Sequence, residues 1–179
     1  MKTKNQIHLF AQLAFGLLLL LPGAAFAQGP VWTHTAAACA VDNASASKYE
    51  TNGARFRFKV DGQTTGNIYA RCNITNPKDD GSNPGWNRLE VAYTDERESP
   101  NFVKATLYRV NKTSGGVSEI GTAFDSINFG AKPSGGAEEV TLTHTFNFTT
   151  YAYFVMLQIH REDASYNPSI SAVRLKRVN

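Results

Sequence analysis

Two cysteines, Cys39 and Cys72, are the residues of this chain with the widest range of chemistry open to them. A cysteine pair can form a disulfide, exchange electrons with other thiols or bind a metal ion. The pair lacks the Cys-x-x-Cys spacing of redox and zinc motifs, and no cluster of further cysteines and histidines accompanies it. In an oxidising compartment, we therefore expect a structural disulfide.

The other titratable residues form no catalytic motif that can be identified. Gly-x-Ser-x-Gly, His-Glu-x-x-His and P-loop motifs are all missing. In the loop 79–85, Asp79, Asp80 and Asn83 could offer oxygens to calcium, although a plain turn explains the same residues. We expect no catalytic residues, no cofactor and no enzymatic activity.

Aromatic residues offer a different chemistry, since the apolar face of a sugar packs against an aromatic ring. Trp86 stands just before an expected strand and, with Tyr93 or Tyr166, could form a surface platform for carbohydrate. A tryptophan at a strand start can also close the end of a β-sandwich, which leaves both interpretations open.

Strands must position all of these side chains. From residue 31 onward, apolar and polar residues alternate with period two, and Gly, Pro, Asn and Asp separate the alternating runs. The pattern predicts an all-β fold, an antiparallel sandwich or jelly roll of about eight to nine strands with one disulfide. The expected strands lie near residues 31–41, 54–60, 67–75, 87–94, 102–110, 117–126, 139–148, 151–160 and 169–178.

A hairpin is expected between 139–148 and 151–160, because their apolar residues fall on one face if residues 149 and 150 form the turn. In this hairpin, Phe154 and Met156 lie on the opposite face, which points outward. Either another part of the sandwich covers them, or they form an exposed apolar patch for a ligand or a second subunit.

The N-terminus has the three zones of a secretory signal peptide: two early lysines, an apolar run over 9–21 and an Ala-x-Ala site that ends at Ala27. The run is too short to span a bilayer stably. We expect cleavage of residues 1–27 and export of a single domain, 28–179, to the periplasm or beyond the cell. The exported part carries 16 basic and 15 acidic side chains, so its charge gives no reason to expect nucleic acid as a partner.

Residues 71–77 (RCNITNP), 105–110 (ATLYRV) and 172–175 (AVRL) resemble segments of small secreted bacterial proteins of unknown function. The resemblance implies a secreted β-sandwich and no particular activity. Chaperone–usher pilins also have a two-cysteine sandwich, but this chain ends in Leu175-Lys176-Arg177-Val178-Asn179, without the aromatic ending of those subunits.

Three functions follow from these features. The first is a non-catalytic binding module, with carbohydrate as the ligand class. The second is a structural or self-associating surface component, such as an adhesion subunit that binds copies of itself or another surface protein through Phe154 and Met156. The third is an enzyme of unidentified class.

Overall fold

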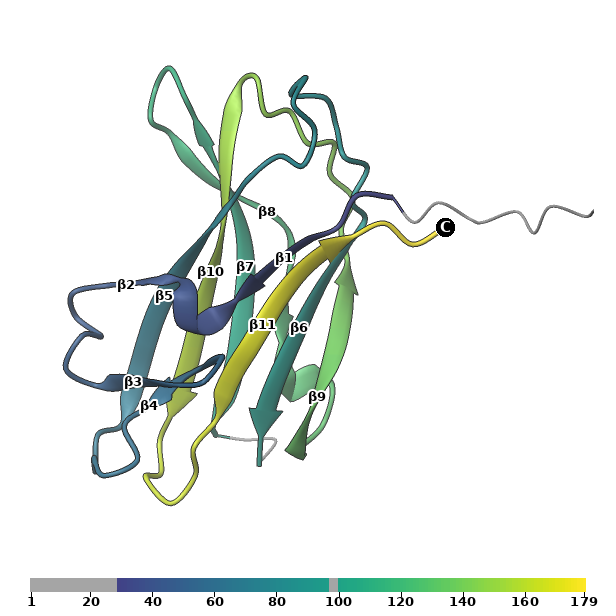
Figure 1. The fold of residues 1–179 in the computed structure, drawn as a ribbon. Helices are drawn as coiled ribbons and strands as arrows, with labels where there is room; N and C mark the ends of the chain where they lie inside the picture. The colour runs from purple at the N-terminus through teal and green to yellow at the C-terminus, as the bar shows by residue number, and fades with distance from the viewer. Residues whose placement is uncertain (1–28, 97–99) are drawn as a thin grey trace, which may run out of the picture.

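The computed structural model describes residues 29–96 and 100–179, and it confirms the all-β sandwich with one disulfide. Two antiparallel sheets lie face to face as two layers (Figure 1). The six-stranded sheet has β1 (Trp32–Thr35) beside β11 and otherwise the order β3 (Tyr49–Asn52), β4 (Arg55–Phe58), β11 (Ser169–Lys176), β6 (Arg88–Asp95), β9 (Lys132–Thr141). The five-stranded sheet has the order β2 (Ala40–Val41), β5 (Gly66–Ile74), β10 (Tyr151–Arg161), β7 (Phe102–Asn111), β8 (Val117–Asp125).

The core lies between the sheets and follows the alternation of the sequence. In β10, Tyr153, Val155, Leu157 and Ile159 are buried, and the residues between them face away from the core. Because β10 lies between β5 and β7, its outward side chains occupy the middle of a sheet face. They therefore have the outward side chains of β5 on one side and those of β7 on the other.

The segment expected as one strand over 31–41 is three elements: β1, the 3-10 turn η1 (Ala36–Ala38) and β2. The prediction of a continuous strand was wrong because β1 pairs with β11 and β2 pairs with β5, so the chain has to pass from one sheet to the other. The buried Ala36 stands at this passage. Strand β3, a short outer strand of the six-stranded sheet, was also missed.

The hairpin expected between 139–148 and 151–160 is not formed. Strand β9 ends at Thr141 and pairs with β6, whereas β10 pairs with β5 and β7 in the opposite sheet. Strand β9 also begins earlier than expected, because an edge strand tolerates Pro133 and a bulge accommodates Gly135, whose φ is +84°.

The predicted signal peptide lies outside the described residues. Within residues 29–96 and 100–179, no helix has the length and apolar character that crossing a bilayer requires.

Candidate functional site

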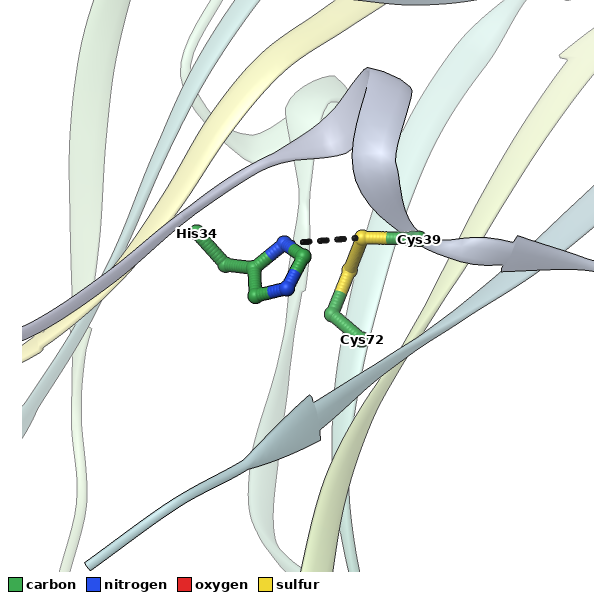
Figure 2. Close-up of side chains that lie close together, drawn as sticks. All are labelled: His34, Cys39 and Cys72. Carbon is green, nitrogen blue, oxygen red and sulfur yellow. Dashed lines mark hydrogen bonds between the residues drawn. A yellow bond between two sulfur atoms is a disulfide. The ribbon is translucent and has the colours of Figure 1, made fainter.

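The disulfide joins Cys39, just after η1, to Cys72 on β5, with Cα atoms 4.6 Å apart. This confirms the predicted bond and places it where the chain passes between the sheets. Figure 2 shows the imidazole of His34 beside the bond, with Nδ1 3.6 Å from Cys39 Sγ. His34 Nδ1 also lies 3.0 Å from the carbonyl oxygen of Thr35.

His34, Cys39 and Cys72 are the one group of three or more potential metal ligands that the described residues bring together, with ligand atoms within 4.8 Å of one another. A metal ion requires thiolate sulfur, and here each sulfur is bonded to the other. His34 is then the one remaining donor of the three. The arrangement in this oxidised state is a covalent link with a histidine packed beside it.

Two of the three side chains considered as calcium ligands, those of Asp80 and Asn83, accept hydrogen bonds within their own loop. Asp80 Oδ1 accepts from the backbone N–H of Ser82 at 2.8 Å, and Asn83 Oδ1 accepts from that of Gly85 at 2.9 Å. These contacts are Asx turns, and they lower the pKa of the Asp80 carboxyl through its hydrogen bonds to Ser82. The loop at Asp79–Gly85 is therefore explained as a turn, which was the alternative reading.

The predicted aromatic platform is wrong. Trp86 is 1% exposed, its indole N–H donates to the Pro30 carbonyl oxygen, and its ring packs edge-on against Phe146 with centroids 5.1 Å apart. Tyr93 faces the core and is also 1% exposed. Tyr166 is half-buried in the loop before β11, at the opposite end of the sandwich from Trp86. Trp86 closes the end of the sandwich, as the alternative interpretation held.

Aromatic side chains gather instead on the outward side of β5, β10 and β7, which we call the outer face. Phe154 and Met156 point outward there, as the alternation predicted, and neighbouring strands leave both half-buried. Met156 stands opposite Arg71 on one side and Thr106 on the other. The outward residues of the three strands are Asn67, Tyr69, Arg71, Asn73, Phe102, Lys104, Thr106, Tyr108, Val110, Ala152, Phe154, Met156, Gln158 and His160.

One row of side chains crosses the outer face through Phe154. Its ring is stacked on the ring of Tyr108, with centroids 5.2 Å apart and 13° between the planes. The guanidinium carbon of Arg71 lies 5.5 Å from the Phe154 centroid, and it comes from β5, on the side away from Tyr108. The row Arg71–Phe154–Tyr108 thus places a cation and two rings across three neighbouring strands.

A second row crosses the same face through His160. Its ring is stacked on Phe102, with centroids 4.9 Å apart and 17° between the planes. Asn67 Oδ1 lies 3.0 Å from His160 Nδ1 and accepts from Gln158 Nε2 at 2.9 Å. Since this oxygen can only accept, the contact requires His160 Nδ1 to carry a proton.

The two rows have the same composition by strand: a polar group on β5, a ring on β10 and a ring on β7. Phe154 and His160 are six residues apart along β10, which corresponds to about 20 Å. The face between them carries Met156 and Gln158. An extended ligand that follows β10 would meet rings near both ends and hydrogen-bonding groups between them.

The outer surface of the six-stranded sheet is quite different, because ion pairs fill it. Glu139 pairs with Arg88 at 3.2 Å and with Lys176 at 2.7 Å, and Glu90 pairs with Arg174 at 3.3 Å and with Lys176. Hydrogen bonding to Lys176 lowers the pKa of the Glu139 carboxyl. The charges that β6, β9 and β11 present on this surface pair with one another, so these strands offer few free charged groups to a ligand.

Sequence reasoning found Phe154 and Met156 but missed Tyr108, Arg71, Phe102 and His160. Each of these four has a signal in the alternation of its own strand, where it stands between core residues. What the alternation cannot give is the order of strands, which brings β5 and β7 to the two sides of β10.

No protein-family model matches the chain, and a search of curated proteins finds no match. Among solved structures, the CBM36-1 domain of a multidomain xylanase from the hindgut metagenome of Trinervitermes trinervoides has a TM-score of 0.49 at 5% identity, over 84% of this chain and 99% of that one. The xylan-binding module CBM15 has a TM-score of 0.47 at 12% identity, over 83% and 97%. A CBM36 module in complex with calcium and xylotriose has a TM-score of 0.45 at 9% identity, over 81% and 99%.

Proposed function

We propose that this protein is an exported, non-catalytic module that binds carbohydrate on the outer face of its five-stranded sheet. The observation that carries the proposal is the pair of rows Arg71–Phe154–Tyr108 and Asn67–His160–Phe102. Rings supply apolar contact to the C–H groups of a sugar, and amide, imidazole and guanidinium groups bond its hydroxyls. Both kinds of group stand side by side on one sheet face.

Tyr108 is the ring best placed to stack on a sugar. Phe154 has Tyr108 beside it and the Arg71 guanidinium over its ring. Phe102 similarly has His160 stacked on it and Lys104 Nζ 5.7 Å from its centroid. Tyr108 contacts Phe154 on the side of β10, and its other side faces β8, the edge of the sheet. A sugar ring at this edge can approach the side of Tyr108 that faces away from Phe154.

The test is a glycan array followed by titration calorimetry on the purified exported protein. The proposal expects saturable binding that the double variant Phe154→Ala/Tyr108→Ala loses, while Arg174→Ala, on the ion-paired surface of the other sheet, binds as the parent does. Circular dichroism and melting temperature establish that each variant is folded. Absence of binding to every glycan, or binding that the double variant retains, would overturn the proposal.

A second candidate function is self-association through the same face, and its specific support is the outward position of Phe154 and Met156. A copy of the chain seated on this face would cover both apolar side chains. Sedimentation across a wide concentration range decides between a monomer and an assembly. If the protein is a monomer at the highest concentration, or assembles equally well with Met156→Lys, self-association through this face is wrong.

Export is part of the proposal, because a disulfide forms and persists outside the reducing cytosol. We propose that the leader is cleaved after Ala27 and that the mature domain works in the periplasm or beyond the cell. Mass spectrometry of the protein recovered from those fractions should give a chain that begins at Gln28. A protein found with its leader intact in the membrane fraction would contradict this.

A further inference from the structure

The charges of the outer face are distributed unevenly. The cations of its strands are Arg71 on β5 and Lys104 on β7. Its carboxylates come from the edge strand β8, where Asp125 pairs with Lys104 at 3.1 Å and Glu119 stands opposite Tyr108. Lys104 is therefore neutralised by its partner, which leaves Arg71 on β5 as the cation of these strands without an ion pair, and Glu119 on the edge strand β8 as the carboxylate without one, among the described residues.

Arg71 differs from three of the four strand arginines on the opposite surface; the fourth, Arg55 on β4, also has no ion pair within the described residues. Arg57, Arg88 and Arg174 each form an ion pair with a glutamate of their own sheet. Within the part of the chain that the structure describes, Arg71 has no ion pair and its guanidinium donates to no protein acceptor. The side chain is exposed, and its guanidinium lies over the Phe154 ring on the outer face.

A guanidinium with free donors beside an aromatic ring is suited to a planar anion. It presents paired N–H donors that match the two oxygens of a carboxylate, and its contact with an aromatic ring costs it little hydration. Lysine, a point charge on a flexible stem, does not offer the same match. A neutral sugar hydroxyl would accept hydrogen bonds from the guanidinium but would not neutralise its charge.

We infer that the carbohydrate bound by the outer face carries a carboxylate, that is, a uronic acid residue, and that Arg71 binds this carboxylate next to the Phe154–Tyr108 pair. The inference rests on the proposed function and names its ligand class. The proposed contact needs a single uronic acid residue. A general attraction for polyanions is not expected, because the exported domain carries nearly as many acidic as basic side chains.

The experiment compares each acidic oligosaccharide with its own methyl ester, which removes the charge and keeps the sugar backbone. The probes are oligogalacturonate, oligoguluronate and glucuronate-containing oligosaccharides, with neutral and sulfated oligosaccharides as further arms. Binding is measured by calorimetry at low and at physiological salt. The expected result is that the acid binds about tenfold more tightly than its ester, with the difference shrinking as salt rises.

Arg71 variants assign the effect to this residue. Arg71→Gln should make acid and ester bind equally, Arg71→Lys should restore part of the preference for the acid, and Arg174→Gln should leave it intact. Equal binding of acids and esters by the parent, or a preference that survives Arg71→Gln, overturns the inference while the proposed function stands. Tighter binding of sulfated than of uronate sugars overturns the carboxylate assignment. Failure to bind any probe, neutral or acidic, contradicts the proposed function itself.

Discussion

The rings of Phe154 and Tyr108 lie nearly parallel across strands β10 and β7, with centroids 5.2 Å apart and 13° between their planes. The residues stand directly opposite each other in the antiparallel register. Both point away from the core and are half-buried. A stacked pair on the open side of a sheet adds little to the core and much to what the surface can bind.

The first prediction concerns the ring at the edge of this pair. Tyr108→Ala should weaken glycan binding about five- to tenfold, because it removes the ring on which the proposed sugar stacks. Tyr108→Phe keeps that ring and should bind within about twofold of the parent, measured by calorimetry. Arg174→Ala, on the ion-paired surface of the other sheet, is the control and should bind as the parent does. An alanine variant with unchanged affinity would show that sugar does not contact this ring.

The second prediction concerns the disulfide. The loop between Cys39 and Cys72 has a sequence separation of 33, so the chain-entropy model gives a stabilisation of about 3–4 kcal/mol. Cys39→Ala/Cys72→Ala should lose at least this much in urea unfolding, since Cys72 is also fully buried. The parent protein with its disulfide reduced should show a similar loss. If reduction leaves the unfolding midpoint unchanged, the bond does not stabilise this fold.

Alternation in the sequence predicted which residues face the core but not how the strands pair. Val140 and Leu142 do point into the same core as Tyr153 and Val155, as the expected hairpin required. They reach it from opposite sheets, because the chain changes sheets between β9 and β10. Apolar residues that face each other across a core and residues that lie side by side in one sheet give the same pattern along a sequence.

The same limit explains the aromatic residues. Tyr93 follows the inward alternation of β6 together with Leu89 and Val91, so its burial could be read from the sequence. Tyr108 and Phe154 are far apart in the chain, and only the order β5, β10, β7 brings them together. Long-range strand order depends on packing of the whole core and has no local signal.

The third prediction concerns alkaline pH. Burial, followed by the nearby charges of Glu138 and Asp95, raises the pKa of Tyr93 to about 12. Its hydroxyl is buried without a hydrogen-bond partner among the described residues. An unfolded tyrosine ionises near pH 10. Above that pH, ionisation of Tyr93 therefore stabilises the unfolded state and not the folded one. The parent should therefore lose stability as pH rises from about 10 to 12.

Tyr93→Phe removes both effects. The variant should be more stable than the parent by about 1 kcal/mol at pH 7, because the buried hydroxyl gains no bond in the fold. Its advantage should widen between pH 10 and pH 12. Urea unfolding at several pH values measures both quantities. A variant less stable than the parent at every pH would indicate that the hydroxyl has a partner, such as a buried water.

The last prediction concerns Arg161, the final residue of β10, which is 1% exposed. Its guanidinium carbon lies 4.3 Å from the ring centroid of Phe58, and its N–H groups donate to the carbonyl oxygens of Thr64 at 2.8 Å, Gly62 at 3.0 Å and Lys59 at 3.4 Å. Burial lowers the pKa of this guanidinium, which nevertheless stays charged at neutral pH. These hydrogen bonds attach the connection between β4 and β5 to the end of β10.

Arg161→Met should cost about 3 kcal/mol in urea unfolding, since it strips several backbone carbonyls of their donor at once. Arg161→Lys retains the charge but cannot reach the carbonyls from one planar group, so it should cost about 1–2 kcal/mol. Hydrogen exchange should speed up over residues 59–66 in both variants while β10 stays protected. Arg174→Met, an exposed arginine on β11, controls for loss of charge. If Arg161→Met unfolds like that control, water replaces the guanidinium without cost and the connection is held by other contacts.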